Sequence, residues 1–245
     1  MKIKKIIFCF SIFLLLFSMT FGLLVKKGII WITTPFEILY TIKGVDVSSY
    51  QGEIDWEIIQ EQDIYFAFIK ATEGSTFNDR YFQKNWDNAS KTNLRIGAYH
   101  FFSFDSSGKT QAENFIKTVK KVDNMLPPVV DIEFYKDKSR NPPTKEETQV
   151  ILNELLLELE KHYGMKPIIY SPRSTYKRYI KGNYDEYDIW IRNLIFFPYL
   201  TGRNPWTFWQ YSNKKILKGY NGDEKYIDMN FFNGNKKDFE KYNTN

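Results

Sequence analysis

Two carboxylates, Asp131 and Glu133, lie two residues apart at the end of a short apolar segment that begins at Val129. A β-branched run of this length is typical of a buried strand. Because side chains alternate across a strand, the two carboxylates should share one face, with Cα atoms about 6.5 Å apart. Adjacent buried carboxylates raise each other's pKa, so one can hold a proton while the other stays ionised. This arrangement suits acid catalysis, and two separate salt bridges at the end of a strand are the simpler alternative.

Eight short apolar segments, several of them followed by a helical pattern, organise the chain from Gly44 onward. The predicted strands are 44–48, 65–71, 95–102, 129–133, 167–170, 188–191, 207–211 and 226–229, and the predicted helices are 55–62, 80–92, 108–122 and 145–163. The last helix has a capping box, Thr144 with Glu147, and ends at Gly164. Alternating strands and helices predict a parallel sheet, and eight strands predict an α/β fold of the (β/α)8-barrel type. Since no clear helix separates 191 from 207, we expect an irregular barrel with some helices missing.

Polar, acidic and aromatic side chains occur at or near the ends of all eight predicted strands. They are Asp46, Ser48, Gln51, Lys70, Glu73, Tyr99, His100, Phe102, Asp131, Glu133, Tyr170, Trp190, Trp209, Gln210, Tyr211 and Asp228. Function gathers at the carboxyl ends of the strands in such barrels. Each residue alone has a structural explanation: Lys70 as a salt-bridge partner, Trp209 as a core residue, His100 as a buried hydrogen bonder. Their coincidence favours a shared cleft. The aromatic content of 18% suits either a cleft that stacks on sugars or a thick core.

Five ordered segments of the chain resemble the N,O-diacetylmuramidase lysozymes, glycoside hydrolase family 25. They are Gly44-Val-Asp46-Val-Ser-Ser-Tyr-Gln51-Gly, Phe66-Ala-Phe-Ile-Lys70-Ala-Thr-Glu73-Gly, Gly97-Ala-Tyr99-His100-Phe, Val130-Asp131-Ile-Glu133 and Trp209-Gln210-Tyr211. The resemblance spans roughly Gly44 to Asn233. It implies a distorted β/α barrel that cleaves the β-1,4 bond between N-acetylmuramic acid and N-acetylglucosamine in peptidoglycan. It also implies that the four active-site acids are Asp46, Asp131, Glu133 and Asp228.

Glycoside hydrolysis needs a proton for the leaving oxygen and negative charge near an oxocarbenium-like carbon. We expect Glu133 to be the general acid and then the base, because its side chain reaches further and neighbouring carboxylates should raise its pKa. Asp131 either attacks directly or orients the substrate's acetamido group, whose oxygen then attacks. Asp46 and Asp228 would maintain the negative field and position the sugar, or else serve as hydrogen bonders at the barrel mouth. The expected substrate-binding residues are Gln51, Lys70, Glu73, Tyr99, Phe102, Tyr170, Trp190, Trp209 and Gln210, and we expect no metal or organic cofactor.

Three other functions compete with this interpretation, and the weakest of them, a cytoplasmic sugar enzyme, does not fit the apolar segment near the amino terminus. A chitinase would need the longer Asp-x-x-Asp-x-Asp-x-Glu pattern, but Leu126 and Val129 occupy its first two acidic positions. A membrane-tethered peptidoglycan-binding module without turnover is the alternative from a different class, and the four retained acids argue against it. Only two histidines, His100 and His162, and one cysteine, Cys9, are present, which argues against a histidine-based triad, a zinc cluster and disulfides.

The first 27 residues form an apolar segment flanked by lysines. The uncharged run Ile6–Val25 follows Lys2, Lys4 and Lys5 and has the roughly twenty residues that a bilayer requires. Because it has no Ala-x-Ala cleavage site, an uncleaved anchor is favoured over a signal peptide. The catalytic domain would then be membrane-anchored and extracytoplasmic, or secreted if the segment is cleaved.

The expected organisation is a signal-anchor or signal peptide at 1–27, a linker or lead-in at 28–43, a glycoside hydrolase barrel at 44–234 and a polar tail at 235–245. The flanking lysines of the apolar segment account for the whole net charge of +5. The folded part is therefore neutral, so the basic pI of 8.9 is no indication of nucleic-acid binding, and the sequence has no basic stripe that would indicate it. We expect peptidoglycan glycan strands and the membrane as partners, and a monomer.

Overall fold

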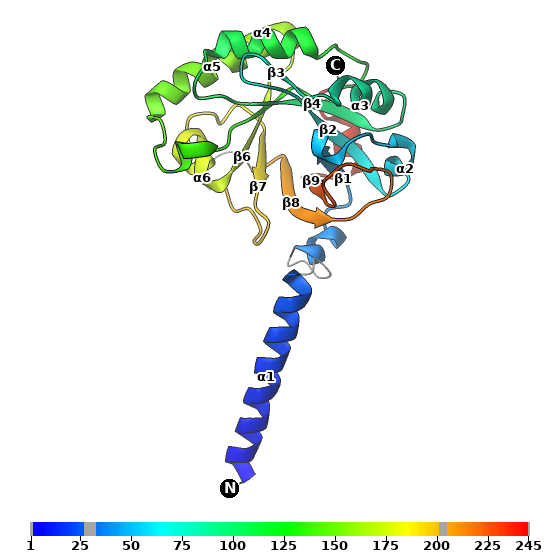
Figure 1. Ribbon diagram of the computed structural model, residues 1–245, viewed down its shortest axis with the longest axis vertical. Helices are drawn as coiled ribbons and strands as arrows, with labels where there is room; N and C mark the ends of the chain where they lie inside the picture. Colours follow the sequence, from blue (N-terminus) through cyan, green and yellow to red (C-terminus); the bar gives the residue numbers. More distant parts are fainter. Residues whose placement is uncertain (1, 27–32, 201–204, 245) are drawn as a thin grey trace.

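The barrel is closed by eight strands, with a long helix projecting from it (Figure 1). The computed structural model describes residues 2–26, 33–200 and 205–244. The ring consists of β1 (Lys43–Val47), β2 (Ile64–Glu73), β4 (Arg95–Phe101), β5 (Val129–Asp131), β6 (Ile168–Pro172), β7 (Ile189–Arg192), β8 (Phe208–Lys215) and β9 (Ile227–Phe232). It closes because β1 pairs with both β2 and β9, while the two-residue β3 (Phe77–Asn78) pairs with β2 outside the ring. The predicted α/β barrel is confirmed.

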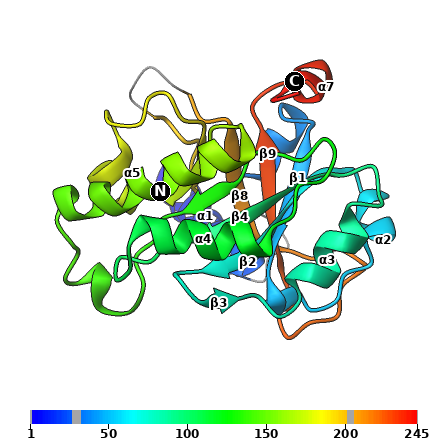
Figure 2. The ribbon, with the colours of Figure 1, turned by 90° about the horizontal axis from the view of Figure 1, so that it is seen from above.

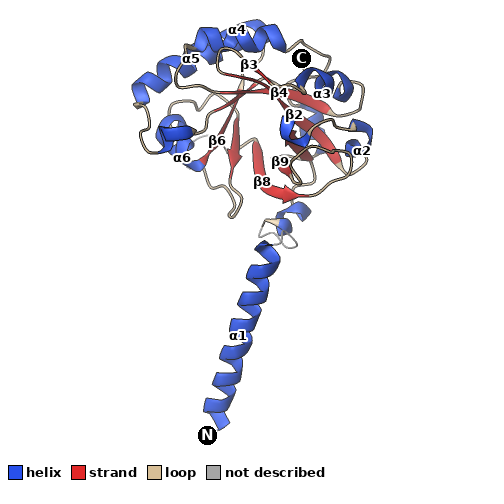
Figure 3. Ribbon diagram, in the orientation of Figure 1, coloured by secondary structure: helices blue, strands red, loops and turns tan. Residues whose placement is uncertain are grey.

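All the helices except α1, which projects away, lie on the outer surface of the barrel and cover it unevenly (Figure 3). They are α1 (Lys2–Lys26), α2 (Trp56–Gln60), α3 (Phe82–Ala89), α4 (Gly108–Thr118), α5 (Lys145–Tyr163), α6 (Arg173–Thr175) and α7 (Lys236–Lys241), with short 3-10 or π turns η1 (Thr34–Ile38), η2 (Ser49–Gln51), η3 (Lys136–Ser139) and η4 (Tyr176–Ile180). Helices α4 and α5 lie side by side on one flank (Figure 2). The α5 capping box and the left-handed Gly164 are present as predicted. Between β7 and β8, the described residues contain no helix.

Strand β9 runs against its neighbours. It pairs antiparallel with both β8 and β1, and Asp46 lies opposite Asp228. The sequence predicted a parallel sheet, which is wrong for β9 because the short, turn-rich connection after β8 contains no crossover helix. Consequently Asp228 lies near the amino end of its strand, yet it reaches the same mouth as the carboxyl ends of the parallel strands.

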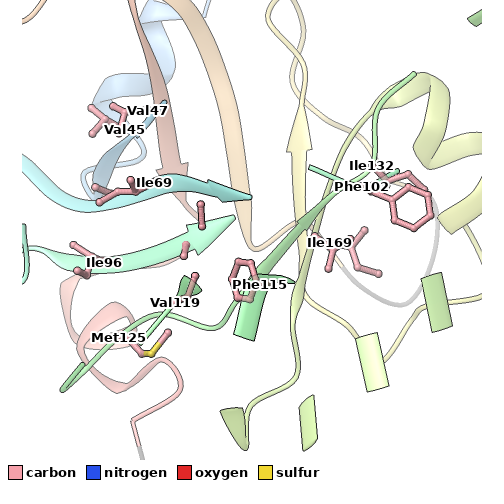
Figure 4. Close-up of a cluster of buried hydrophobic side chains, with 14 of the residues drawn as sticks. Val45, Val47, Ile69, Ile96, Phe102, Phe115, Val119, Met125, Ile132 and Ile169 are labelled. Carbon is pink, nitrogen blue, oxygen red and sulfur yellow. The ribbon is translucent and has the colours of Figure 1, made fainter. Parts of the chain in front are cut away.

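Two apolar layers lie on the two sides of the strands. Inside the ring, aromatic side chains fill the barrel, with the rings of Phe68 and Trp190 stacked 4.6 Å apart. Outside, Ile69, Phe115 and other apolar side chains pack between the strands and the helices (Figure 4). Both faces of most strands are therefore apolar, as is usual for parallel sheets covered by helices.

Glycine at position 44 makes room for a ring inside the barrel. A Cβ atom there would lie 2.3 Å from the Phe66 ring. We expect Gly44→Ala to lower the stability of the barrel by about 1–3 kcal/mol, because the ring must move within a filled interior. Thermal unfolding measures the effect, and Lys43→Ala is the control on the same strand. A Gly44→Ala melting temperature equal to that of the parent would contradict this packing.

The segments expected as a lead-in and a tail pack onto the barrel. Before β1, Thr33 donates its hydroxyl proton to the carbonyl of Tyr211 at 2.9 Å, and Phe36 contacts the Trp209 ring at 5.2 Å. After β9, Phe239 of α7 is buried, and Arg95 Nη1 donates to its carbonyl at 2.7 Å. Both flanks are thus part of the folded unit.

Candidate active site

A cleft of about 500 Å³ opens at the mouth of the barrel. All four predicted acids line it: Asp46 from β1, Asp131 at the end of β5, Glu133 just beyond, and Asp228 from β9. The predicted substrate-binding residues that also line it are Gln51, Lys70, Tyr99, Tyr170, Trp190 and Gln210. Residues far apart in the sequence are therefore gathered in one groove by closure of the ring.

The carboxylates of Asp131 and Glu133 share the cleft because extended pairing continues past the end of β5. The amide of Ile132 donates to the carbonyl of Tyr170 at 3.0 Å, and the Ile132 side chain is buried in the outer layer. Alternation then turns both neighbouring carboxylates inward. The two-residue spacing in the sequence is thus translated into a pair on one face.

Three of the predicted substrate-binding residues lie outside the cleft. Phe102 and Trp209 are fully buried in the outer layer, where Trp209 Nε1 donates to the carbonyl of Asn193 at 2.8 Å. The physical reason is alternation: their neighbours Phe101 and Gln210 face inward instead. Glu73 is not a lining residue either, and it pairs with Lys70 at 3.0 Å.

His100 is a structural residue on the outer side of β4. Its Nδ1 lies 2.7 Å from Thr72 Oγ1 and its Nε2 lies 3.0 Å from Gln111 Oε1. Burial lowers the pKa of His100 to about 4, so the ring is neutral at physiological pH. The structural explanation given for His100 from the sequence, a buried hydrogen bonder, is therefore the one that applies.

Several lining residues were not identified from the sequence. They are Val47, Tyr50, Phe101, Asn213, Lys214, Glu224 and Tyr226, together with Ser48, which was noted only at a strand end. A further cation, Arg192, holds Nη1 4.0 Å from Glu133 Oε2. Arg192 and Tyr226 each lie two residues from a predicted site residue, so strand alternation was a usable signal. Tyr50 of η2 and Glu224 of the connection from β8 to β9 are joined by a backbone hydrogen bond, and no local sequence pattern shows that contact.

A single amide side chain connects two of the acids. Gln210 Nε2 donates to Asp46 Oδ2 at 2.9 Å and to Asp228 Oδ2 at 3.0 Å. The Tyr170 hydroxyl donates to Gln210 Oε1 at 3.0 Å, which orients the amide so that its nitrogen faces the carboxylates. The pair is therefore held close together by a neutral donor.

A second amide fixes Asp46 from the other side. Asn230 Nδ2 donates to Asp46 Oδ2 at 2.7 Å, and Trp190 Nε1 donates to Asn230 Oδ1 at 2.8 Å. Because Trp190 is stacked in the barrel interior, its indole is a rigid support for this arrangement. Asp46 thus has little freedom to turn.

Residues 45–220 match the family described as glycosyl hydrolases family 25. The chain belongs to this family. The solved family 25 glycosyl hydrolase of Bacillus anthracis is 56% identical, over 84% of this chain and 95% of that chain, with a TM-score of 0.80. Lysozyme M1 of Streptomyces globisporus is 30% identical, over 79% of this chain and 68% of its own length. The bacterial lysozyme of Streptomyces coelicolor is 28% identical, over 81% of this chain and 94% of that chain, with a TM-score of 0.73.

Burial raises the pKa of the cleft acids of this glycosyl hydrolase and so favours their protonated forms. It raises the pKa of Asp46 to about 6, against the hydrogen bonds from Asn230 and Gln210, and it raises the pKa of Asp228 to about 8, aided by the charge of Asp46. Burial and then the charge of Glu133 raise the pKa of Asp131 well above its usual range. These shifts are typical of catalytic clefts.

The pKa of Glu133 is also raised. Burial is the main cause, and not the neighbouring carboxylates that the sequence suggests, while Arg192 and a hydrogen bond with Tyr170 oppose the shift. Glu133 and Asp131 therefore both favour their neutral forms in the free cleft.

One carboxylate oxygen in the cleft has no partner. Asp131 Oδ1 is buried and makes no hydrogen bond. An unsatisfied buried acceptor costs free energy and calls for a donor, which substrate can supply. In the described part of the chain, no three acidic, histidine or cysteine side chains are placed to hold a metal ion.

We expect Asp228→Asn to stabilise the folded family 25 domain more at pH 8 than at pH 4. The pKa of Asp228 is about 8 in the folded protein and 3.8 ordinarily, so between these values the folded state holds a proton that the unfolded chain lacks. Its contribution to stability therefore falls as the pH rises through this window, and asparagine removes that loss. Melting temperatures of parent and variant across the pH range measure the effect. An equal difference in melting temperature between parent and variant at pH 4 and at pH 8 would exclude a raised pKa of Asp228.

Proposed function

We propose that this glycoside hydrolase is a lysozyme that hydrolyses the β-1,4 bond between N-acetylmuramic acid and N-acetylglucosamine, with Glu133 as general acid and base. The observation that carries the proposal is the convergence of Asp46, Asp131, Glu133 and Asp228 in one cleft. Two acids of unequal environment on one face are the minimum that glycosidic cleavage requires. Relatives named lysozymes align over most of the chain.

Glu133 performs both proton transfers. Protonated Glu133 donates to the glycosidic oxygen as the bond to the anomeric carbon breaks, and the resulting carboxylate then takes a proton from the attacking water. Arg192, 4.0 Å away, stabilises that carboxylate between the two steps. Burial favours the return of the proton, because it raises the pKa of Glu133.

Asp131 orients the substrate's own acetamido group. Its Oδ1 accepts the acetamido N–H, which turns the acetamido oxygen toward the anomeric carbon. The unpartnered state of that oxygen in the free cleft supports this role. Accepting the N–H favours the ionised form of Asp131, and its charge then stabilises the positive ring that forms when the acetamido oxygen attacks. Direct attack by Asp131 is the alternative that also retains configuration.

Asp46 and Asp228 position the sugar and keep the floor of the cleft acidic. Trp190 is a poor stacking surface, because Phe68 stacks on it at 4.6 Å and Tyr170 packs against it at 4.5 Å. Tyr50 lines the cleft and is 67% exposed, so its ring is the better platform for a sugar. Sugar stacking is thus assigned to Tyr50 at the edge of the cleft rather than to Trp190 on its floor.

A protein that acts on peptidoglycan works outside the cytoplasm, and the helix at the amino terminus is consistent with either a signal or an anchor. We propose that α1 is a retained anchor and that the enzyme is a monomer. Its segment Lys2–Val25 is long and apolar enough to cross a membrane and makes no contact that buries it. Membranes washed at alkaline pH should retain the full-length chain, and a soluble shortened chain would contradict the anchor.

Release of new reducing ends from purified peptidoglycan tests the enzymatic function. The full-length chain is expected to generate them continuously, with the amount proportional to enzyme and time. Sedimentation of the protein with peptidoglycan in the absence of any new reducing end would instead support the binding module without turnover.

A further inference from the structure

We propose that an apolar surface on the side of the barrel that faces α1 rests on the lipid bilayer that holds α1. This surface, the apolar rim, consists of Ile38, Leu39, Ile195, Phe196 and Tyr199. The proposal goes beyond the glycosidase activity and rests on the proposed retention of α1. It assigns a partner, a lipid surface, to residues that have no role in the cleft.

The rim side chains are unusually exposed for their type. Ile38 and Leu39 are 83% and 71% exposed, and Phe196 and Tyr199 are 65% and 79% exposed. They come from two segments that touch, because the Phe36 and Phe197 rings lie 5.7 Å apart. A contiguous apolar surface of this kind marks an interaction site rather than the scatter of single residues found on most proteins.

The short stretch of chain between α1 and the barrel indicates that the apolar rim is covered by the lipid bilayer. The described helix ends at Lys26 and the barrel unit starts at Thr33, and the chain between them reaches at most about 25 Å when fully extended. The intervening sequence includes Ile29, Ile30 and Trp31, residue types favoured in and near the membrane interface. The rim is therefore confined near the bilayer surface whenever α1 spans it.

The arrangement of the elements agrees with this constraint. η1 and the connection from β7 to β8 lie on the side of the barrel that faces α1, whereas α4 and α5 lie on the opposite side (Figure 1). Both segments are held to the barrel: Phe197 packs on Trp209 at 5.7 Å, and Glu37 of η1 pairs with Lys215 of β8 at 3.3 Å. A rigid rim can hold the barrel in one orientation.

Docking of the rim would set the position of the cleft above the membrane. Strand β8 connects the two sites, because Gln210, Asn213 and Lys214 line the cleft and Lys215 pairs with η1. With the rim in the interface, the enzyme would reach glycan strands at one height rather than throughout the volume swept by a free tether. The rim thus restricts which layer of the wall is cleaved.

A fluorescence experiment on the full-length chain tests the contact. Phe196→Cys in a Cys9→Ser background is labelled with an environment-sensitive dye and placed in nanodiscs with one chain per disc. Leu157→Cys is the matched control, since Leu157 is 63% exposed on α5, on the side of the barrel away from α1. A second rim position, Tyr199→Cys, guards against a local effect of one substitution, and release of reducing ends verifies that each variant is folded.

We expect dye at 196 and 199 to emit at shorter wavelength than dye at 157. Lipids carrying a nitroxide near the headgroup should quench the rim dyes at least twofold and leave the control unchanged. Equal emission and quenching at all three positions would overturn the proposal. Shielding that appears only in discs with two chains would also overturn it, because a second copy would then be the cover. Failure of the glycosidase activity would be seen separately, in the reducing-end assay.

Discussion

Glu133→Gln is expected to lower turnover on purified peptidoglycan by about 10³-fold or more while the barrel stays folded. Glutamine keeps the shape and the neighbours of the side chain, including Arg192 and Tyr170, but it has no acidic proton to give to the glycosidic oxygen. The loss should appear in the rate of reducing-end release and not in the melting temperature. Removing a partly buried carboxyl with a raised pKa should leave stability unchanged or increase it.

The control for this variant is Glu113→Gln, which makes the same chemical change on the exposed face of α4. It should retain the parent's activity and stability. If Glu133→Gln turned over peptidoglycan at a rate close to that of Glu113→Gln, the proton donor would have to be another group in the cleft.

Asp131→Asn is expected to reduce turnover by roughly 10²–10³-fold, because it removes the negative charge that stabilises the cationic intermediate. Asparagine can still accept the acetamido N–H through its oxygen, so substrate binding should change much less than the rate. Initial rates over a range of peptidoglycan concentrations separate the two effects. Asp131→Ala should lower both the turnover rate and the affinity for substrate.

Peptidoglycan with its muramic acid N-deacetylated distinguishes the two possible roles of Asp131. If the acetamido oxygen attacks, the parent enzyme should lose activity on this substrate. The Asp131→Asn variant should then lose little further activity on it, because both changes remove the same step, the oriented attack of the acetamido oxygen. If Asp131 is the nucleophile, the two losses should multiply.

The chemistry of the cleft was largely predictable because it depends on strand alternation. Asp131 and Glu133 share a face for the same reason that their spacing suggested, and all eight predicted strands are present. Alternation was less useful where both faces of a strand are apolar, since Phe102 and Trp209 look like cleft residues until their inward neighbours, Phe101 and Gln210, are seen. A shift of one residue reverses the face.

Other features depended on tertiary structure. The direction of β9 follows from a short connection, and Tyr50 and Glu224 reach the cleft through a contact between η2 and the connection from β8 to β9. The raised pKa of Glu133 was predicted, but its main cause is burial, which cannot be judged before the barrel is assembled. The packing of Phe36 and Phe239 against the barrel likewise required the three-dimensional arrangement.

Mass spectrometry of peptidoglycan digested by the full-length enzyme tests the central claim most directly. Cleavage by the proposed mechanism leaves N-acetylmuramic acid at each new reducing end and N-acetylglucosamine at each new non-reducing end, and Glu133→Gln should yield neither. New reducing ends formed by N-acetylglucosamine would show that the other glycosidic bond is cut and would contradict the proposed function.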